Sequence, residues 1–219
     1  MPILSRFHSD TPRSSRRAML FSAPRTAVAA LGMLIIACTA MAYPRPAAVP
    51  YRWELHFEPG PLRLYVDDLE GAAYWYFTYT VTNRTGRDQT WAPTFVLFTD
   101  AGEILHSGEH VPQRVTREIM DMLGNDLAQN QYEIIGEILQ GREHAKDGVV
   151  VWPARQLNIT ELSLFVSGTS GETARVKNPV TDEESLLRKT LQRDYLIPGS
   201  PLARGSREIE LVRQQWIFR

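Results

Sequence analysis

The strongest constraint on the fold is a run of aromatic and β-branched residues between positions 73 and 82. Residues 74–82 are Tyr-Trp-Tyr-Phe-Thr-Tyr-Thr-Val-Thr. Such residues fit the pleated, half-buried surface of a sheet better than they fit a helix or a loop. Because the turn-forming residues Asn83-Arg84-Thr85-Gly86 follow directly, we predict a strand that ends near position 82.

Alternating patterns elsewhere predict further strands. Residues 51–57 and 62–66 alternate apolar with polar side chains, and Pro59-Gly60 predicts a turn between them. The other predicted strands cover residues 90–99, 149–152, 161–167, 173–177 and 209–218. Many short strands with short connections favour antiparallel pairing. We therefore predict a mainly β fold, an immunoglobulin-like antiparallel β-sandwich over residues 51–219 that lacks the cysteine pair of antibody domains.

Two stretches have the periodicity of helices instead. Between positions 113 and 140, apolar residues recur at helical spacing, and Gly124 and Gly141 provide helix ends. This pattern predicts a two-helix insertion that covers an edge or the mouth of the sheet. Thr181-Asp182-Glu183-Glu184 has the pattern of a capping box, which predicts one further helix that extends to about Arg193.

Residues 1–42 have the composition of an export signal. Five arginines and one acid, Asp10, precede an apolar run from Ala27 to Ala42. Ala40-Met41-Ala42 fits a cleavage site that would leave Tyr43 as the first residue. The alternative is a retained membrane anchor, although the run is shorter than the roughly 20 residues that span a bilayer. We expect an exported protein, periplasmic or extracellular.

Two details of this segment point to bacterial export. Ile35-Ile36-Ala37-Cys38 resembles a lipobox, in which Cys38 would carry a lipid anchor, but cleavage after Ala42 would remove this only cysteine. Ser15-Arg16-Arg17-Ala18-Met19-Leu20 resembles a twin-arginine signal, and a merely basic leader is the alternative. Without Cys38 the chain would have no disulfide and no thiol nucleophile.

The charge of the processed chain disfavours nucleic acid as a partner. The whole chain has 24 Lys and Arg against 25 Asp and Glu, and removal of residues 1–42 leaves a net charge of about −5. Such a protein lacks the broad positive field that attracts a phosphate backbone. Residues 43–50 contain three prolines, which predicts an extended spacer before the domain.

Several stretches resemble those of exported bacterial proteins with an immunoglobulin-like sandwich. They are residues 79–83, 95–100 and 162–166. Residues 168–172 and 187–192 are similar to those of one uncharacterised exported family of this kind. The resemblance covers residues 51–219 and implies the sandwich fold, but it implies no activity and no functional residue.

The strand at positions 73–82 offers one candidate binding surface. Tyr74 and Tyr76 lie on one face of it, and Trp75 and Phe77 lie on the other. If the Trp75 side is the core, Tyr74 and Tyr76 could stand on an open face, where amphipathic rings stack on sugars or anchor a protein. Alternatively, a covering helix or a second sheet buries them.

One motif is compatible with metal chemistry. His106-Ser107-Gly108-Glu109-His110 matches H-x-x-E-H, which holds zinc only when a helix places both histidines on one face. Gly108 and the nearby Pro112 favour a polar loop and a chance match. A non-catalytic site that uses His106, His110 and Glu109 is the alternative. His56 and His144 are predicted surface residues, and residues 168–171 a hairpin turn.

The sequence supports two hypotheses about function. The first is a non-enzymatic exported binding or scaffolding protein of the cell envelope, whose partner is an unknown envelope protein or glycan. The second is a metal-dependent hydrolase that uses His106, Glu109 and His110. We find no cofactor fingerprint and no Ser-His-Asp order, so no cofactor is predicted.

Overall fold

The computed structural model describes residues 43–178 and 180–219. The predicted export signal, the cleavage site after Ala42 and the lipid attachment at Cys38 lie outside the described residues. Within the described residues, no helix is long and apolar enough to cross a membrane.

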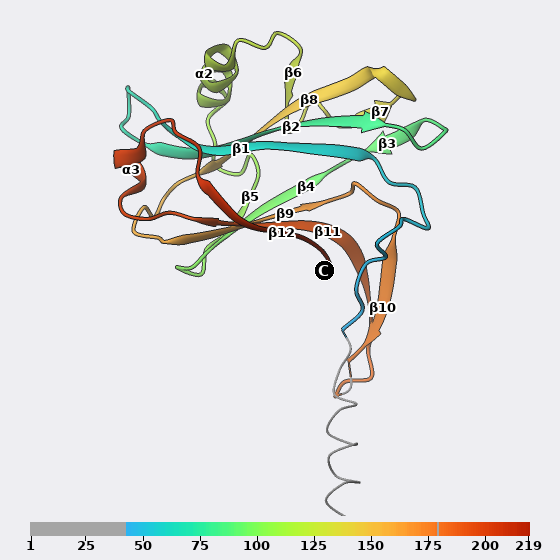
Figure 1. The fold of residues 1–219 in the computed structure, drawn as a ribbon. Coiled ribbons are helices and arrows are strands. Elements are labelled where there is room, and N and C mark those ends of the chain that lie inside the picture. Colours follow the sequence, from blue (N-terminus) through green and yellow to red (C-terminus); the bar gives the residue numbers. More distant parts are fainter. Residues whose placement is uncertain (1–42, 179) are drawn as a thin grey trace, which may run out of the picture. The chain divides into compact units, whose positions relative to one another are not determined.

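The described chain is mainly β, as predicted, and its strands form several open sheets (Figure 1). One sheet has the order β1 (His56–Val66), β2 (Ala73–Asn83), β8 (Gly141–Pro153), β6 (Ala128–Asn130). The second has the order β10 (Thr173–Lys177), β11 (Glu184–Leu196), β9 (Glu161–Ser167), β4 (Thr94–Thr99), β5 (Ile104–His106), and β12 (Glu210–Phe218) also pairs with β11. A small ribbon joins β3 (Gln89–Trp91) to β7 (Gly136–Ile138).

Antiparallel pairing dominates, as the short connections predicted. Among the described strands, only β6 pairs in parallel, with β8. The predicted turn at Pro59-Gly60 is wrong, because β1 continues through it with a bulge between Pro59 and Leu62. The predicted strand at 51–57 begins only at His56.

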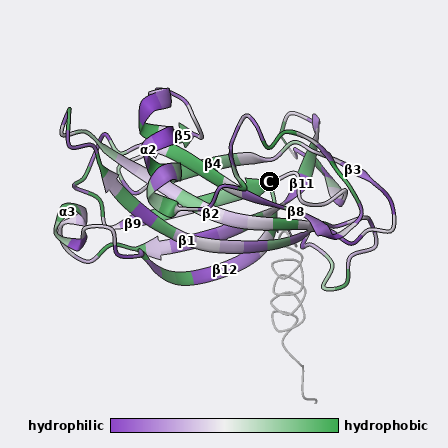
Figure 2. Ribbon diagram, turned by 90° about the horizontal axis from the view of Figure 1, so that it is seen from above, coloured by the Kyte–Doolittle hydropathy of each residue, from purple (hydrophilic) through white to green (hydrophobic). Residues whose placement is uncertain are grey.

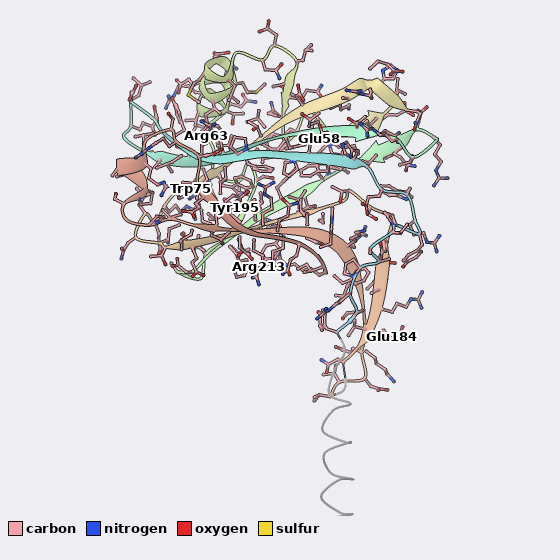
Figure 3. All side chains as sticks on the ribbon, viewed as in Figure 1. Glu58, Arg63, Trp75, Glu184, Tyr195 and Arg213 are labelled. Atoms are coloured by element: carbon pink, nitrogen blue, oxygen red, sulfur yellow. The ribbon has the colours of Figure 1, made fainter. Side chains whose placement is uncertain are left out.

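The two larger sheets share one apolar core. Trp75, Phe77 and Tyr79 of β2 point into it, as their alternation predicted. The rings of Phe77 and Tyr79 lie with centroids 6.4 and 4.8 Å from that of Phe95 on β4. Figure 3 shows Trp75 and Tyr195 between the two layers of strands. Burial of such side chains stabilises the fold by about 1.5–3 kcal/mol each.

A helix covers part of the opposite face of the first sheet. This helix, α2 (Gln113–Leu123), ends at Gly124 in the left-handed conformation, so the first half of the predicted insertion is confirmed. Val115 and Ile119 are fully buried in a second apolar cluster with residues of β2 and β8. Figure 2 shows α2 above the strands.

The second helix of the insertion is not formed. Residues 125–140 instead contain β6, a turn and β7. Asn130 stabilises the turn, since its side-chain oxygen accepts hydrogen bonds from the N–H groups of Tyr132 and Glu133. Ile134 enters the core from the turn and Ile138 enters it from β7. Their four-residue spacing therefore resembles that of a helix although each residue is buried by a different element.

The helix predicted for residues 181–193 is also wrong, because strand β11 occupies most of this segment. Thr181 and Glu183 hydrogen-bond to each other in a turn in which Asp182 has a φ of 63°, so no capping box forms. The central and C-terminal part of β11 is paired on both sides, with β9 and with β12. These ladders satisfy the backbone and override the local helical signal. The only helix nearby is the short α3 (Pro201–Arg204).

An ion pair fixes α2 to the loop that joins β1 and β2. Arg114 donates two hydrogen bonds to the buried carboxylate of Asp67, at 3.0 and 2.6 Å. It also contacts Glu118, which accepts a hydrogen bond from Tyr65. The hydrogen bonds from Arg114 hold the pKa of Asp67 below its usual value.

Replacing Ile119 by alanine should lower the free energy of unfolding by about 2–5 kcal/mol, because it leaves a cavity beneath α2. Met122 on the same helix is 49 % exposed, so Met122→Ala should change the free energy by no more than about 0.5 kcal/mol. Urea unfolding followed by circular dichroism measures both. Equal losses would contradict the described packing of α2.

The Asp67–Arg114 pair should make stability depend on pH. Since the pKa of Asp67 is lowered in the folded state, its contribution is present above about pH 4 and is lost as the pH falls through the folded pKa. Arg114→Met should therefore lower Tm at pH 6, and the difference from wild type should shrink towards pH 3. Lys177→Met, which breaks the exposed pair with Asp182, should change Tm little at either pH. If the difference in Tm between wild type and Arg114→Met stays constant from pH 6 to pH 3, this linkage is excluded.

Candidate functional site

Tyr74 and Tyr76 do not stand on an open surface. They are 5 % and 2 % exposed and pack with Val115 and Ile119 beneath α2. Burial raises the pKa of both phenols. The prediction that these two residues form an open binding surface is wrong, because α2 covers them, and the alternative interpretation of a covering helix is confirmed.

Further along β2, beyond the end of α2, the side chains on the same face as Tyr74 and Tyr76 become accessible to solvent. Thr78 and Thr80 continue the row along β2 and are partly exposed. They line a cleft of about 340 Å³ together with Glu58 of β1, Asn125 and Asp147. Figure 3 shows Glu58 on β1, in the upper layer. The face of the sheet is thus divided into an apolar half under α2 and an open polar half, which we call the threonine cleft.

Two glycines shape the threonine cleft. Gly60 lies within the bulge of β1 and approaches Thr78 so closely that an added Cβ would overlap the threonine hydroxyl. Gly148 lies opposite Tyr79, whose ring would overlap a Cβ at that position. A larger residue at Gly60 would displace Thr78 from the cleft, and one at Gly148 would displace the Tyr79 ring in the core, so the two glycines permit the observed packing on both faces of the sheet.

Asp147 is held in a fixed orientation in this cleft. Its Oδ1 accepts a hydrogen bond of 2.6 Å from Thr80 Oγ1, and its Oδ2 accepts one of 2.9 Å from Asn125 Nδ2. Asn125 is itself held by the N–H of Leu127. The cleft therefore presents a carboxylate whose position does not depend on a ligand.

The charged side chains that line the threonine cleft are all acidic. Glu58 and Asp147 contribute carboxylates, and among the described residues that line the cleft there is no Lys, Arg or His. Glu58 also contacts His56 at 2.8 Å, at the exposed rim. A carboxylate accepts hydrogen bonds and donates none. The cleft thus suits neutral hydroxyl donors or a cationic group and disfavours anions.

The residues of the H-x-x-E-H motif are not arranged for zinc catalysis. His106 ends β5, while Glu109 and His110 lie in the following turn, where His110 has a φ of 57°. No helix places the histidines on one face. Across the described parts of the chain, no three His, Cys, Asp or Glu residues converge to hold a metal. His110 instead lines a shallow depression of about 420 Å³ beside Tyr74.

Residues 168–171 do not form the predicted hairpin turn. They connect β9 to β10, and these two strands lie one after the other along the same partner, β11. Gly171 and Ser170 pair with Trp53 and Glu54 of the segment before β1. The predicted surface positions of His56 and His144 are confirmed, since both are exposed.

A buried charge cluster was missed from the sequence. Lys189 is 2 % exposed, and its Nζ lies 2.6 Å from Glu54 and 3.3 Å from Glu172. Burial lowers the pKa of Lys189, but the two carboxylates outweigh this effect and raise it. Glu172 also accepts a hydrogen bond of 2.8 Å from the N–H of Ala47, so the predicted spacer is attached to the domain. The helix predicted for 181–193 concealed the inward position of Lys189.

Comparison with known proteins found no family model, no curated protein and no solved structure that matches the chain.

Because the motif residues lie in a turn, the purified protein should retain no stoichiometric zinc after incubation with zinc and dialysis. His106→Ala should leave the metal content unchanged, as measured by elemental analysis. One equivalent of retained zinc that disappears in His106→Ala would contradict the described geometry.

Proposed function

We propose that the domain is an immunoglobulin-like β-sandwich. The order β1-β2-β8-β6 corresponds to the A-B-E-D sheet of that fold, and β11-β9-β4 corresponds to G-F-C. The core shared by the two sheets supports this assignment. Two features depart from the usual topology, since β6 is parallel to β8 and β12 adds a strand beyond β11.

We further propose that the protein is exported and acts as a non-enzymatic binding or scaffolding protein of the cell envelope. The basic segment and apolar run of residues 1–42 support export. The observation that carries the binding function is the threonine cleft. It is the polar, preoriented hollow at the end of α2, and its described lining residues include two carboxylates and no Lys, Arg or His.

The chemistry of the cleft limits the ligand. Thr78 can donate and accept hydrogen bonds, whereas Thr80, whose O–H is donated to Asp147, only accepts, as do the carboxylates of Asp147 and Glu58. A sugar with several hydroxyl groups, or an amine on an envelope component, satisfies these groups. Phosphate or carboxylate groups would be repelled by Glu58 and Asp147. The partner is therefore an uncharged or cationic group of an envelope glycan or protein.

The alternative of a metal-dependent hydrolase gains no support. It requires His106, Glu109 and His110 around one ion, and these residues lie in a strand end and a turn. The cleft itself offers fixed acceptors but no nucleophile with an adjacent base among its described lining residues. This arrangement suits binding better than a reaction.

Thr78→Arg should weaken binding to isolated cell envelopes, because a guanidinium group would fill the cleft between Glu58 and Asp147. Purified protein is mixed with envelope fragments, and the fragments are then sedimented. The fraction of protein that sediments with them is measured over a range of protein concentrations. Wild type should saturate, and the variant should bind at least about tenfold more weakly.

Thr94→Arg is the matched control, because Thr94 is exposed at the start of β4 on the other sheet. It should bind like wild type. Equal binding of Thr78→Arg and wild type would exclude the cleft as the binding site. Absence of any saturable wild-type binding would remove the proposed function.

A further inference from the structure

Strand β12 forms a long free edge of the second sheet. It has nine residues and pairs with β11 alone among the described strands. Its residues from Glu210 to Gln215 are all exposed, including the apolar Leu211 and Val212. Figure 2 shows β12 along one margin of the fold. An edge of this kind presents backbone donors and acceptors to any extended chain.

The other sheet edges are blocked or short. β1 contains Pro59 and Pro61 at its bulge, and its Leu62 carbonyl already accepts a hydrogen bond from Ile209. β5 and β6 have three residues each. β10 carries Arg175 and Lys177. Bulges, prolines, short length and basic residues all protect edges from pairing. In β12 such protection is limited to the bulge at Val212 and to Arg213, which pairs with Asp194, so the stretch 214–218 has none.

The register identifies which backbone groups are free. Arg188 and Arg219 exchange both backbone hydrogen bonds, at 2.8 and 3.1 Å. Directly opposite residues in an antiparallel ladder alternate between such pairs and pairs whose groups point away. The N–H and C=O groups of Gln214, Trp216 and Phe218 therefore point away from β11. No described residue forms a hydrogen bond to them.

Side chains hold this edge in place on both faces of the sheet. On the outer face, Arg213 pairs with Asp194 at 2.6 Å and Gln215 bonds to Gln192 at 3.0 Å. Figure 3 shows Arg213 on the outer side of the lower layer. On the inner face, the Trp216 ring lies 5.1 Å from Lys189 Nζ, and Phe218 is buried. The free backbone groups are thus preoriented, which lowers the entropic cost of binding.

We propose that β12 binds an extended segment of a partner polypeptide, which adds to the sheet as a further strand. The regular part of the edge, Arg213–Phe218, is about 20 Å long at the usual rise of a strand. The added strand would bond to Gln214, Trp216 and Phe218. Its side chains on the inner face would lie beside Trp216 and Phe218, so apolar residues at alternate positions fit there, with polar residues between them.

A second copy of this chain fits the edge less well. Antiparallel self-pairing that uses all three free residues of both copies would be centred on Trp216 and would place Arg213 opposite Arg219 of the second copy. Like charges directly opposite each other destabilise a strand pair. Six residues of edge also bury far less than the roughly 800 Å² per partner of a stable interface.

The test uses octapeptides selected from a random phage-displayed library on the purified protein. Selected peptides should alternate apolar and polar residues, and their affinity is measured by fluorescence polarisation. Gln214→Pro removes one edge-facing N–H but no hydrogen bond to β11, and should weaken binding about tenfold or more. Gln214→Ala keeps the N–H and should bind like wild type. Equal affinity for Gln214→Pro would overturn the proposal.

Hydrogen exchange of the wild type provides a second measurement that does not depend on the variant's folding. Adding a selected peptide should slow exchange at the amides of Gln214, Trp216 and Phe218, while Gln215 and Ile217 are already protected by β11. Failure to select any peptide, or protection elsewhere, would reject the edge as a docking site. A dimer seen by light scattering without peptide, with these same amides protected, would assign the edge to a second copy.

Discussion

The aromatic row of β2 is the constraint on which the rest of the structure depends. Trp75, Phe77 and Tyr79 fill the space between the two larger sheets, where the rings of Phe77 and Tyr79 meet Phe95 from β4. Because side chains alternate along a strand, this choice of core face fixes the opposite row of β2 as the outer face. The apolar beginning of that outer row then requires a cover, which α2 supplies. Its polar end, Thr78 and Thr80, needs none and forms the floor of a cleft.

The same alternation explains the charged residues of β11. Lys189 and Arg193 point inward with Leu191 and Tyr195, so two cations enter the region between the sheets. Lys189 is balanced by Glu54 and Glu172, and the guanidinium of Arg193 lies over the rings of Phe77 and Tyr195. Breaking such a buried pair usually costs several kcal/mol, because one charge is left without a partner. These contacts attach β11 to the segment before β1, to the segment before β10 and to the core ring of Phe77.

Some of this architecture could be predicted from the sequence and some could not. The strand at 73–82 could be predicted, because every residue from Tyr74 to Thr82 is aromatic or β-branched. The capping pattern at the start of segment 181–193 predicts a helix. The segment forms a strand because it pairs with β9 and β12, and a local pattern contains no information about such distant partners. The sequence alone does not decide whether Tyr74 and Tyr76 are buried, since their burial depends on where α2 packs. The threonine cleft was missed because Thr80, Asn125 and Asp147 come from three distant segments.

The attachment of the N-terminal segment has a consequence for the order of assembly. Ala47 is held by Glu172, 125 residues later, and Arg63 bonds to the carbonyl of Ser206, 143 residues later. Contacts between residues so distant along the chain form slowly, because closing the long loop between them costs conformational entropy before the contacts can stabilise the fold. As the polypeptide is synthesised, its first strands cannot reach their final surroundings until β11 and β12 have emerged. The chain thus stays incompletely folded, and accessible to chaperones, for most of its synthesis.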